Sequence, residues 1–358
     1  MDRNSAVIIA EAGVNHNGSL DIALKLIDAA ADAGADFIKF QTFKTENLVT
    51  RDTLKANYQM DSTGHETTQY EMLKGLELTD NDHFELLRRC NKRKIKFLST
   101  PFDLESFIFL NDKLGQNLIK IGSGDLTNAP LLYEASKRNC HLILSTGMST
   151  IDEIKLALSI LAYGYLGGRN PSVKNFSAAF TDPKGRRALH DNVVLLHCTT
   201  DYPTPYNSIN LRAMDTLKNK FGLNVGYSDH SLGSSVAIAA VILGAWGVEK
   251  HLTLDRLMEG PDHAASMEPD EFATMVSDIG AAVSSLGNGI KKPTKTETKN
   301  KKVVRKILVS AKPISKGELL TTKNLTVKRA GTGVSALEYF NWLGTTACRS
   351  FDINEPIQ

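Results

Sequence analysis

The segments VGYSDHS and VEKHLT each contain one histidine, His230 in the first and His251 in the second. Alternate side chains of an extended strand share a face, so Ser228 lies on the same side as His230, and Glu249 on the same side as His251. If the segments are neighbouring strands, two neutral imidazoles and a carboxylate meet, which suits a divalent transition metal with open positions for substrate and water. Histidines that are simply hydrogen-bonded within a core are the alternative.

Three lysines, Lys39, Lys120 and Lys250, occur inside apolar segments. A lysine in such a place is costly unless it reaches water, pairs with a carboxylate or binds an anion. Lys39 and Lys120 are accompanied by hydroxyl donors at the ends of the apolar segments, which favours a small, highly charged anion such as a phosphate ester. Structural ion pairs are the alternative. The hydroxyl donors are Thr100, Ser123 and Ser145.

Eight short apolar segments recur along the chain, and most are followed by a segment of helical period. This pattern predicts an α/β fold with a parallel sheet buried on both faces, and eight units are what a closed (β/α)8 barrel requires. An open, doubly wound sheet is the alternative, although no GxGxxG motif follows the first strand. The predicted strands are residues 7–13, 36–42, 96–102, 118–124, 141–147, 193–199, 224–230 and 247–253.

Polar residues gather at the C-terminal end of every predicted strand. In a barrel these ends surround one mouth, where barrel enzymes keep their active sites. Glu11, at the end of the first strand, is therefore either a mouth carboxylate acting as acid or base or a cap for the following helix.

Composition changes mark the expected domains. Residues 1–287 are predicted to form the barrel, 288–305 have the Lys, Thr and Asn content of a linker, and 306–358 contain short strand-like segments broken by Gly and Pro. Residues 163–191 are expected to be a surface insertion and 42–80 a lid over the mouth.

The bulk composition excludes several classes of protein. A net charge of +2 over 358 residues is too small to indicate nucleic-acid binding. No apolar run approaches the roughly 20 residues needed to cross a membrane, and the first apolar segment is too short for a signal peptide. The four cysteines are widely spaced without a CxxC pair, which is typical of reduced thiols. We therefore expect a cytoplasmic protein.

Several long motifs, in one order, give the chain a family resemblance. They include IIAEAGVNHNGS, KIGSGDLTNAPLL, LLHCTTDYPTPY, GYSDHS, EKHLTLD and GPDHAASMEPDE. The chain resembles the N-acetylneuraminate (sialic acid) synthases, a family that includes legionaminic and pseudaminic acid synthases. Its last domain resembles the antifreeze-like (SAF) module that ends these enzymes, through VSAKPISKGELLTTKNLTVKRAGTG.

The resemblance implies a metal-dependent condensation of phosphoenolpyruvate with an open-chain N-acetylated amino sugar. The acceptor would be N-acetylmannosamine or a 2,4-diacetamido hexose, and the products a nine-carbon 2-keto-3-deoxy acid and phosphate released by C–O cleavage. It also implies a domain-swapped homodimer in which Arg329 reaches the sugar of the other subunit.

The same resemblance assigns roles to single residues. His230 and His251 would bind the metal, typically Mn2+ in this family, with Mg2+ or Co2+ as alternatives, while Glu11 would help to position a water molecule. Asp125, which stands where many bacterial members carry Glu, is expected to be catalytic together with Glu11, Lys39 and Lys120. The residues expected to hold phosphoenolpyruvate are Lys39, Thr100, Lys120, Ser123, Ser145 and Ser228, and those expected to contact the sugar are Gln41, Tyr202 and Asp262.

Two other functions are compatible with these residues. One is a Schiff-base aldolase with Lys120 as nucleophile, because burial can tune a strand lysine to attack a carbonyl. The other is a non-catalytic carbohydrate-binding or ice-binding protein, against which the set Lys39, Lys120, His230 and His251 argues.

Overall fold

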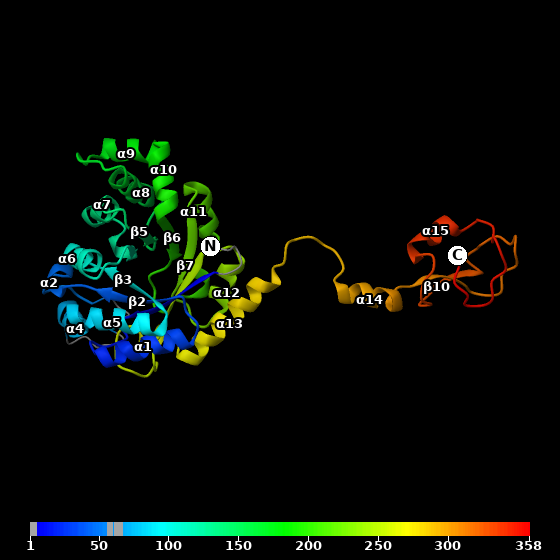
Figure 1. Ribbon diagram of the computed structural model, residues 1–358, viewed down its shortest axis with the longest axis horizontal. Helices are drawn as coiled ribbons and strands as arrows, with labels where there is room; N and C mark the ends of the chain where they lie inside the picture. Colours follow the sequence, from blue (N-terminus) through cyan, green and yellow to red (C-terminus); the bar gives the residue numbers. More distant parts are fainter. Residues whose placement is uncertain (1–5, 56–59, 61–66) are drawn as a thin grey trace. The chain divides into compact units, whose positions relative to one another are not determined.

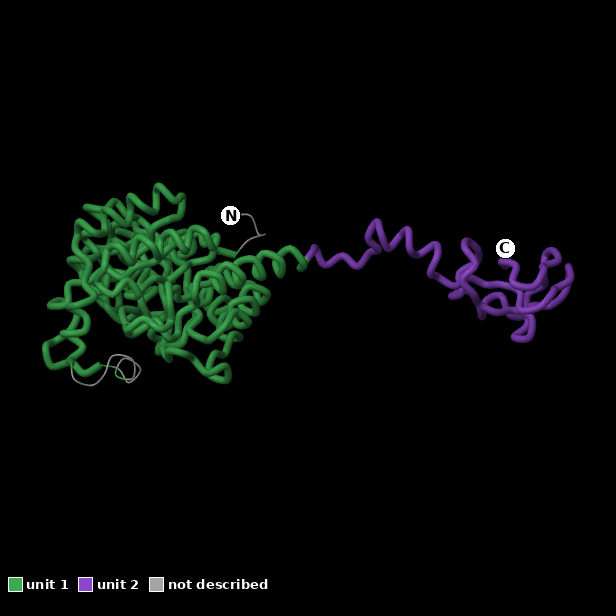
Figure 2. The backbone as a smooth tube through the Cα atoms, turned by 90° about the horizontal axis from the view of Figure 1, so that it is seen from below, with its two compact units in different colours: residues 1–286 green, residues 287–358 purple. Residues whose placement is uncertain are grey.

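The computed structural model describes residues 6–55, 60 and 67–358. The chain forms two compact units, Met1–Leu286 and Gly287–Gln358, shown in different colours in Figure 2. None of the helices described is both long enough and apolar enough to cross a membrane.

Eight parallel strands build the first unit, in the spatial order β3-β2-β1-β8-β7-β6-β5-β4. The two strands at the ends of this order, β3 and β4, lie against each other, so the sheet curls into a barrel with the helices outside it (Figure 1). The predicted (β/α)8 barrel is confirmed. The strands are β1 (Val7–Gly13), β2 (Phe37–Thr42), β3 (Lys96–Pro101), β4 (Leu118–Ile121), β5 (His141–Ser145), β6 (Val193–Cys198), β7 (Asn224–Asp229) and β8 (Gly247–His251).

The barrel interior has an apolar layer below a polar one. Ile9, Phe37, Leu98, Ile143 and Leu196 form a buried cluster of their own. Side chains of a strand alternate between faces, so the residue two positions farther along points to the same interior. Those residues, one layer closer to the mouth, are Glu11, Lys39, Thr100, Ser145 and Cys198.

Amphipathic helices cover the outside of the barrel and hold the strands in register. The first is capped as its sequence predicts, because the Ser19 side chain accepts a hydrogen bond from the Ile22 N–H. The helices are α1 (Leu20–Asp32), α2 (Thr45–Leu48), α4 (Gln69–Leu76), α5 (Asp80–Arg93), α6 (Leu104–Ile108), α7 (Ala129–Lys137), α8 (Ile151–Tyr165), α9 (Val173–Thr181), α10 (Pro183–Asn192), α11 (Ala213–Phe221), α12 (Ser235–Ile242) and α13 (Pro269–Ser285).

The segment predicted to be a surface insertion, 163–191, is helical. It contains the end of α8, then α9 and nearly all of α10, and these helices pack against one another. Tyr163 is buried and its ring meets that of Phe176 edge to face, with 5.2 Å between the centroids. The segment therefore belongs to the helical layer that covers the barrel.

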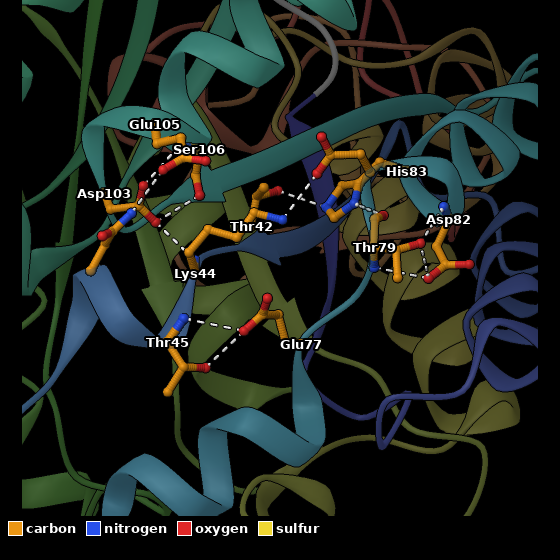
Figure 3. Close-up of polar contacts among 12 residues, drawn as sticks. Thr42, Lys44, Thr45, Glu77, Thr79, Asp82, His83, Asp103, Glu105 and Ser106 are labelled. Carbon is orange, nitrogen blue, oxygen red and sulfur yellow. Dashed lines mark hydrogen bonds and ion pairs between the residues drawn. The ribbon is translucent and has the colours of Figure 1, made fainter. Parts of the chain in front are cut away.

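Polar contacts fix both ends of the segment predicted to be a lid, 42–80 (Figure 3). Thr45 donates from its backbone N–H and its hydroxyl to Glu77, at 3.2 and 3.0 Å. His83 Nε2 lies 2.9 Å from the Thr42 hydroxyl, and the Lys44 N–H donates to Asp103 at 2.9 Å. Residues 56–59 and 61–66 lie outside the described part of the chain, so the lid role of the whole segment stays a prediction.

The second unit has its own small core around an antiparallel pair, β9 (Ile307–Ser310) and β10 (Leu325–Lys328). Leu308, Ile314 and Phe351 are among its buried apolar residues. Before this core, the residues predicted to form a linker, 288–305, contain the exposed helix α14 (Lys295–Val304), which begins with a capping box of Thr294 and Glu297. A short helix, α15 (Tyr339–Trp342), completes the unit.

Candidate functional site

A cavity of about 1190 Å³ opens at the C-terminal ends of the barrel strands. Described parts of 42–80 contribute to its wall through α2 and α4. Every site residue predicted within the barrel lines this one cavity, whereas Arg329 is exposed in the second unit, directly after β10. The predicted residues that line it are Glu11, Lys39, Gln41, Thr100, Lys120, Ser123, Asp125, Ser145, Tyr202, Ser228, His230, His251 and Asp262.

Two lysines and two carboxylates form the charged floor of the cavity. Lys39 Nζ lies 2.6 Å from Glu11 Oε2 and 3.8 Å from Glu249 Oε2, and Lys120 Nζ donates to Glu249 Oε1 at 3.0 Å. All four side chains are almost completely buried. Each lysine thus forms the ion pair that the structural alternative expects. The same two lysines also line the cavity, as the anion-site interpretation requires.

The two carboxylates differ in how readily they hold a proton. Burial raises the pKa of Glu11 to about 7, against the opposing effect of Lys39. Burial acts on Glu249 in the same direction, but Lys120 and Lys39 outweigh it and lower the pKa of Glu249 to about 2. Glu249 therefore carries the fixed negative charge, and Glu11 can gain or lose a proton near neutral pH.

Hydroxyl groups surround this floor. The Thr100 hydroxyl accepts from Lys39 Nζ at 3.2 Å, and the Ser228 hydroxyl donates to Glu249 Oε1 at 2.8 Å. Ser123 Oγ accepts from the Gly147 N–H at 3.0 Å. Ser145 Oγ is buried and has no hydrogen-bond partner. A buried hydroxyl without a partner is unfavourable, so this atom is suited to bind a ligand in the cavity.

The two histidines face each other across β7 and β8, with ring centroids 5.5 Å apart. Burial lowers the pKa of His230 to about 4, and burial together with His230 lowers that of His251 well below its ordinary value, so both rings are neutral. His230 Nδ1 lies 2.7 Å from the Thr199 carbonyl oxygen, which can only accept, so Nδ1 carries the hydrogen and Nε2 the lone pair, with Ser228 Oγ 3.4 Å from Nε2. His251 Nδ1 is buried without a hydrogen-bond partner.

The surroundings of the histidines add one ring and one carboxyl group. The ring of Tyr202 lies against His230 at a tilt of 34°, with 4.2 Å between centroids, and meets His251 edge to face at 5.6 Å. Asp262 Oδ2 lies 3.9 Å from His251 Nδ1. Within the described residues, no group of three or more His, Cys, Asp or Glu side chains is arranged to hold a metal ion.

Three of the predicted residues converge on one glycine. A Cβ atom on Gly13, whose φ of +53° also favours glycine, would lie 3.3 Å from Glu11 Oε1 and 3.5 Å from both Asp262 Oδ2 and Gln41 Nε2. Burial raises the pKa of Asp262 to about 6. The glycine therefore keeps a space open that three polar groups surround.

Asp125 follows β4, which lies across the barrel from β8. Its Oδ1 accepts from Asn128 Nδ2 at 2.9 Å, and burial raises its pKa. Asn128 also caps α7 by accepting from the Leu131 N–H. The carboxyl group is thus fixed to the start of a helix.

Lys250, the third lysine inside a strand, lies on the other face of the sheet. It sits between Glu249 and His251, so its side chain leaves β8 on the side away from the cavity, where it pairs with Asp229 at 2.8 Å. For Lys250 the structural ion-pair alternative is confirmed.

Three other histidines near the barrel strands are hydrogen-bonded within the structure. His197 Nε2 lies 2.8 Å from the Ile209 carbonyl, His263 Nδ1 lies 2.7 Å from the Thr253 hydroxyl, and His16 Nδ1 accepts from the Gly18 N–H at 3.0 Å. None of the three lines the cavity.

Sequence analysis missed Glu249 as a site residue, although strand parity placed it on the inner face. The missing information was its contact with Lys120, 129 positions away in the sequence. It also missed Cys198, whose Sγ lies 3.1 Å from Ser123 Oγ, and Gly147, where a Cβ atom would lie 2.8 Å from the same hydroxyl.

Comparison with known proteins agrees with this geometry. Residues 26–291 match the model of the NeuB family. The chain is 47% identical over 352 residues to N,N'-diacetyllegionaminic acid synthase of Campylobacter jejuni, covering 98% of both chains, and 42% identical to the protein of the same name from Legionella pneumophila, covering 94% and 89%. Among solved structures, N-acetylneuraminic acid synthetase of Leptospira borgpetersenii in complex with citrate superposes with a TM-score of 0.66 at 33% identity, covering 83% of this chain and 90% of that one.

Proposed function

The chain belongs to the NeuB family, and from that premise we propose that it condenses phosphoenolpyruvate with an open-chain 2,4-diacetamido hexose. It is a sialic-acid-type synthase, and the product would be a nine-carbon 2-keto-3-deoxy acid of the legionaminic type. The choice of acceptor is supported by the two diacetyllegionaminic acid synthases that match over nearly the whole chain.

The observation that carries the proposal is the pairing of Lys39 and Lys120 in one buried cavity lined with hydroxyl groups. Two ammonium groups at the bottom of a water-poor mouth favour a dianion such as the phosphate of phosphoenolpyruvate. We assign this group to the two lysines together with the hydroxyls of Thr100, Ser123, Ser145 and Ser228.

The two histidines are proposed to hold a divalent metal, Mn2+ in the first instance, with Mg2+ or Co2+ as alternatives. Neutral rings on adjacent strands fit such an ion, with its other positions left for water and substrate. The donors would be the Nε2 lone pair of His230, which lies 3.4 Å from Ser228 Oγ, and the Nδ1 of His251, which has no hydrogen-bond partner among the described residues. When bound, the metal would supply a Lewis acid near the acceptor's carbonyl oxygen.

The chain's own residues would then direct the reaction. Carbon 3 of phosphoenolpyruvate forms the new bond to the aldehyde carbon, water adds at carbon 2, and phosphate leaves as its C–O bond breaks. Lys39 and Lys120 stabilise the charge on the departing phosphate. Glu11, with a pKa of about 7, would orient the attacking water and take up its proton.

The sugar is assigned to the opposite wall of the cavity. Tyr202 and Asp262 lie beside the histidines and, together with Gln41, would contact its amide and hydroxyl groups. Asp125, which lines the cavity after β4, would help to hold the sugar or the reaction intermediate from the other side. We further propose that the second unit is an SAF module and that Arg329 reaches the sugar bound to the partner in a domain-swapped homodimer.

The test is phosphate release from phosphoenolpyruvate. Protein stripped of metal with a chelator is supplied with Mn2+ and with either a 2,4-diacetamido hexose or N-acetylmannosamine. Faster release with the diacetamido sugar, lost on chelation, is expected. Faster release with N-acetylmannosamine would reassign the acceptor, and no release with either would overturn the synthase proposal.

One observation favours the Schiff-base aldolase as a second candidate. Burial lowers the pKa of Lys120, which makes an uncharged amine more accessible, although Glu249 opposes the effect. Borohydride treatment in the presence of pyruvate separates the two functions, because only the aldolase forms a covalent adduct on Lys120.

A further inference from the structure

A closed polar network lies behind the two histidines, on the face of β7 and β8 that points away from the cavity. The carboxylate of Asp229 accepts from Lys250 Nζ at 2.8 Å through Oδ2, and from the Ser231 N–H and hydroxyl at 2.9 and 2.7 Å through Oδ1. Lys250 Nζ also donates to the Ser231 carbonyl. All three side chains are at most 1% exposed.

Burying two opposite charges is a poor way to gain stability. The cost of removing both from water is comparable to their attraction, and an apolar pair of similar size is often as stable. The space between the strands and helices of a barrel is otherwise filled by apolar side chains, as it is here around Leu252 and Tyr227. The network is therefore better explained by what it orients than by its contribution to stability.

Its members flank both histidines in the sequence. Asp229 and Ser231 stand on either side of His230, and Lys250 directly precedes His251. Asp229 and Lys250 are also register partners in the ladder between β7 and β8. One buried ion pair thus joins the two strands at the level where their next residues turn toward the cavity.

The direction of the His230 ring depends on its backbone as well as on its contacts with Ser228 Oγ, at 3.4 Å, and with the Tyr202 ring. Its ring is held by Nδ1–H donation to the Thr199 carbonyl, and its own carbonyl accepts from the Thr204 N–H. Both contacts form only if the backbone of residues 229–231 keeps its position along the strand and its orientation. A Ser231 that is bonded to Asp229 twice and to Lys250 once provides that constraint.

We propose that Asp229, Lys250 and Ser231 are positioning residues that fix the directions of the His230 and His251 rings from the opposite face of the sheet. The proposal concerns the geometry of the imidazoles, and only one of its readouts rests on the metal role proposed above.

The main test uses the double variant Asp229→Asn/Lys250→Met, which removes the ion pair without leaving one charge buried alone. The first readout is the ¹⁵N NMR signature of the His230 ring in metal-free protein, assigned by its absence in His230→Gln. Wild type should give one Nδ1–H tautomer, and the variant a mixture of tautomers. The second readout is the Kd for Mn2+ by electron paramagnetic resonance, expected to rise about 10- to 100-fold.

The matched control is Asp28→Asn/Arg89→Met, which removes an ion pair between α1 and α5, far from the cavity in the fold. Both variants are compared at equal loss of Tm, so that general destabilisation is accounted for. The control should keep the wild-type tautomer and Kd. A double variant that folds and retains the single tautomer overturns the proposal.

A milder variant covers the case in which the double variant does not fold. Ser231→Ala removes one of the three hydrogen bonds to Asp229 and keeps the ion pair. It should broaden or split the His230 ring signals, and unchanged signals would overturn the proposal. If wild-type protein binds no Mn2+, the metal assignment fails, while the tautomer readout still decides whether the network positions the ring.

Discussion

The two faces of β7 and β8 treat their polar groups in opposite ways. On the outer face, both oxygens of Asp229 are hydrogen-bonded and Lys250 has two partners. On the inner face, Glu249 Oε2 and His251 Nδ1 are just as buried but have no hydrogen-bond partner among the described residues, and the nearest cation to Glu249 Oε2 is Lys39 Nζ at 3.8 Å. The same two strands thus carry a closed ion-pair network on the outer face and open polar atoms on the inner face, although the Tyr227 hydroxyl on the outer face is also buried without a hydrogen-bond partner among the described residues.

This difference separates groups that serve the fold from groups that serve a ligand. Buried polar atoms without partners cost about 1–3 kcal/mol each, so a fold retains them only where something else compensates. The inner face is the only one of the two that borders the cavity. The open atoms that border the cavity, on Glu249 and His251, therefore indicate where substrates bind, whereas the Tyr227 hydroxyl on the outer face does not, and the paired atoms indicate how the strands are held.

The largest expected effect is on the inner face. His251→Ala should lower phosphate release by about 10³-fold or more, because it removes one of the two donors of the proposed metal site. The unfolding free energy should change by only about 1 kcal/mol, since His251 Nδ1 has no protein partner to lose. Phosphate release and urea unfolding measure the two quantities.

The matched control is a histidine that points outward. His197 donates to the Ile209 carbonyl and packs against Tyr227. His197→Gln should cost stability and leave turnover within about threefold of wild type. If His251→Ala instead keeps the wild-type turnover, the assignment of His251 as a metal ligand is wrong.

Much of this arrangement could be predicted from the sequence, because strand parity and strand ends are local properties. Apolar segments predicted the eight strands to within a few residues, alternation placed Glu249 on the same face as His251, and the position of Glu11 at a strand end placed it at the mouth. The pairing of Lys120 with Glu249 could not be predicted, since two inward side chains on nonadjacent strands meet only after the barrel closes.

The stability of the fold should depend on pH through His16, a buried histidine outside the cavity. Burial lowers the pKa of His16 to about 4 from an ordinary value of 6.5. As the pH falls, the His16 side chain is therefore protonated in the unfolded chain before it is protonated in the folded one. The free energy of unfolding that His16 contributes above pH 6.5 is lost as the pH falls to about 4. The loss is at most about 3 kcal/mol. Unfolding of wild type and His16→Gln at several pH values should show a shallower pH dependence in the variant, and equal dependence would contradict the assignment.

The next effect tests the fixed charge on the cavity floor. Glu249→Gln should lower kcat/KM about 10²-fold, because Lys120 loses the partner that orients it, yet Gln can still accept from Ser228. Removing a negative charge beside two lysines should also tighten binding of inorganic phosphate about tenfold, as measured by calorimetry. Glu85→Gln, on the exposed side of α5, is the control for charge alone. Weaker phosphate binding in Glu249→Gln would place the phosphate away from these lysines.

What the sequence could not convey at all is how closely the cavity wall is packed around its hydroxyls. Gly147 follows β5 with an ordinary φ, so neither its backbone nor its position in the motif STGM shows that a side chain would not fit. Its close neighbours come from other strands, Ser123 after β4 and Cys198 at the end of β6. The requirement for glycine arises from the barrel and from no local feature.

The smallest effect predicted follows from this packing. In Gly147→Ala the new methyl group would lie 2.8 Å from Ser123 Oγ and 3.1 Å from Cys198 Sγ, so Ser123 must turn away. If the Ser123 hydroxyl holds the phosphate, KM for phosphoenolpyruvate should rise about tenfold while kcat changes little, because lost binding that is equal in the ground and transition states appears in KM. Gly280→Ala, on the exposed surface of α13 with open space around it, should leave both constants unchanged. A fall in kcat at constant KM would instead mean that Ser123 acts in the transition state. The hydrogen bond from the Gly147 N–H to Ser123 Oγ would then position a catalytic group of the inner face.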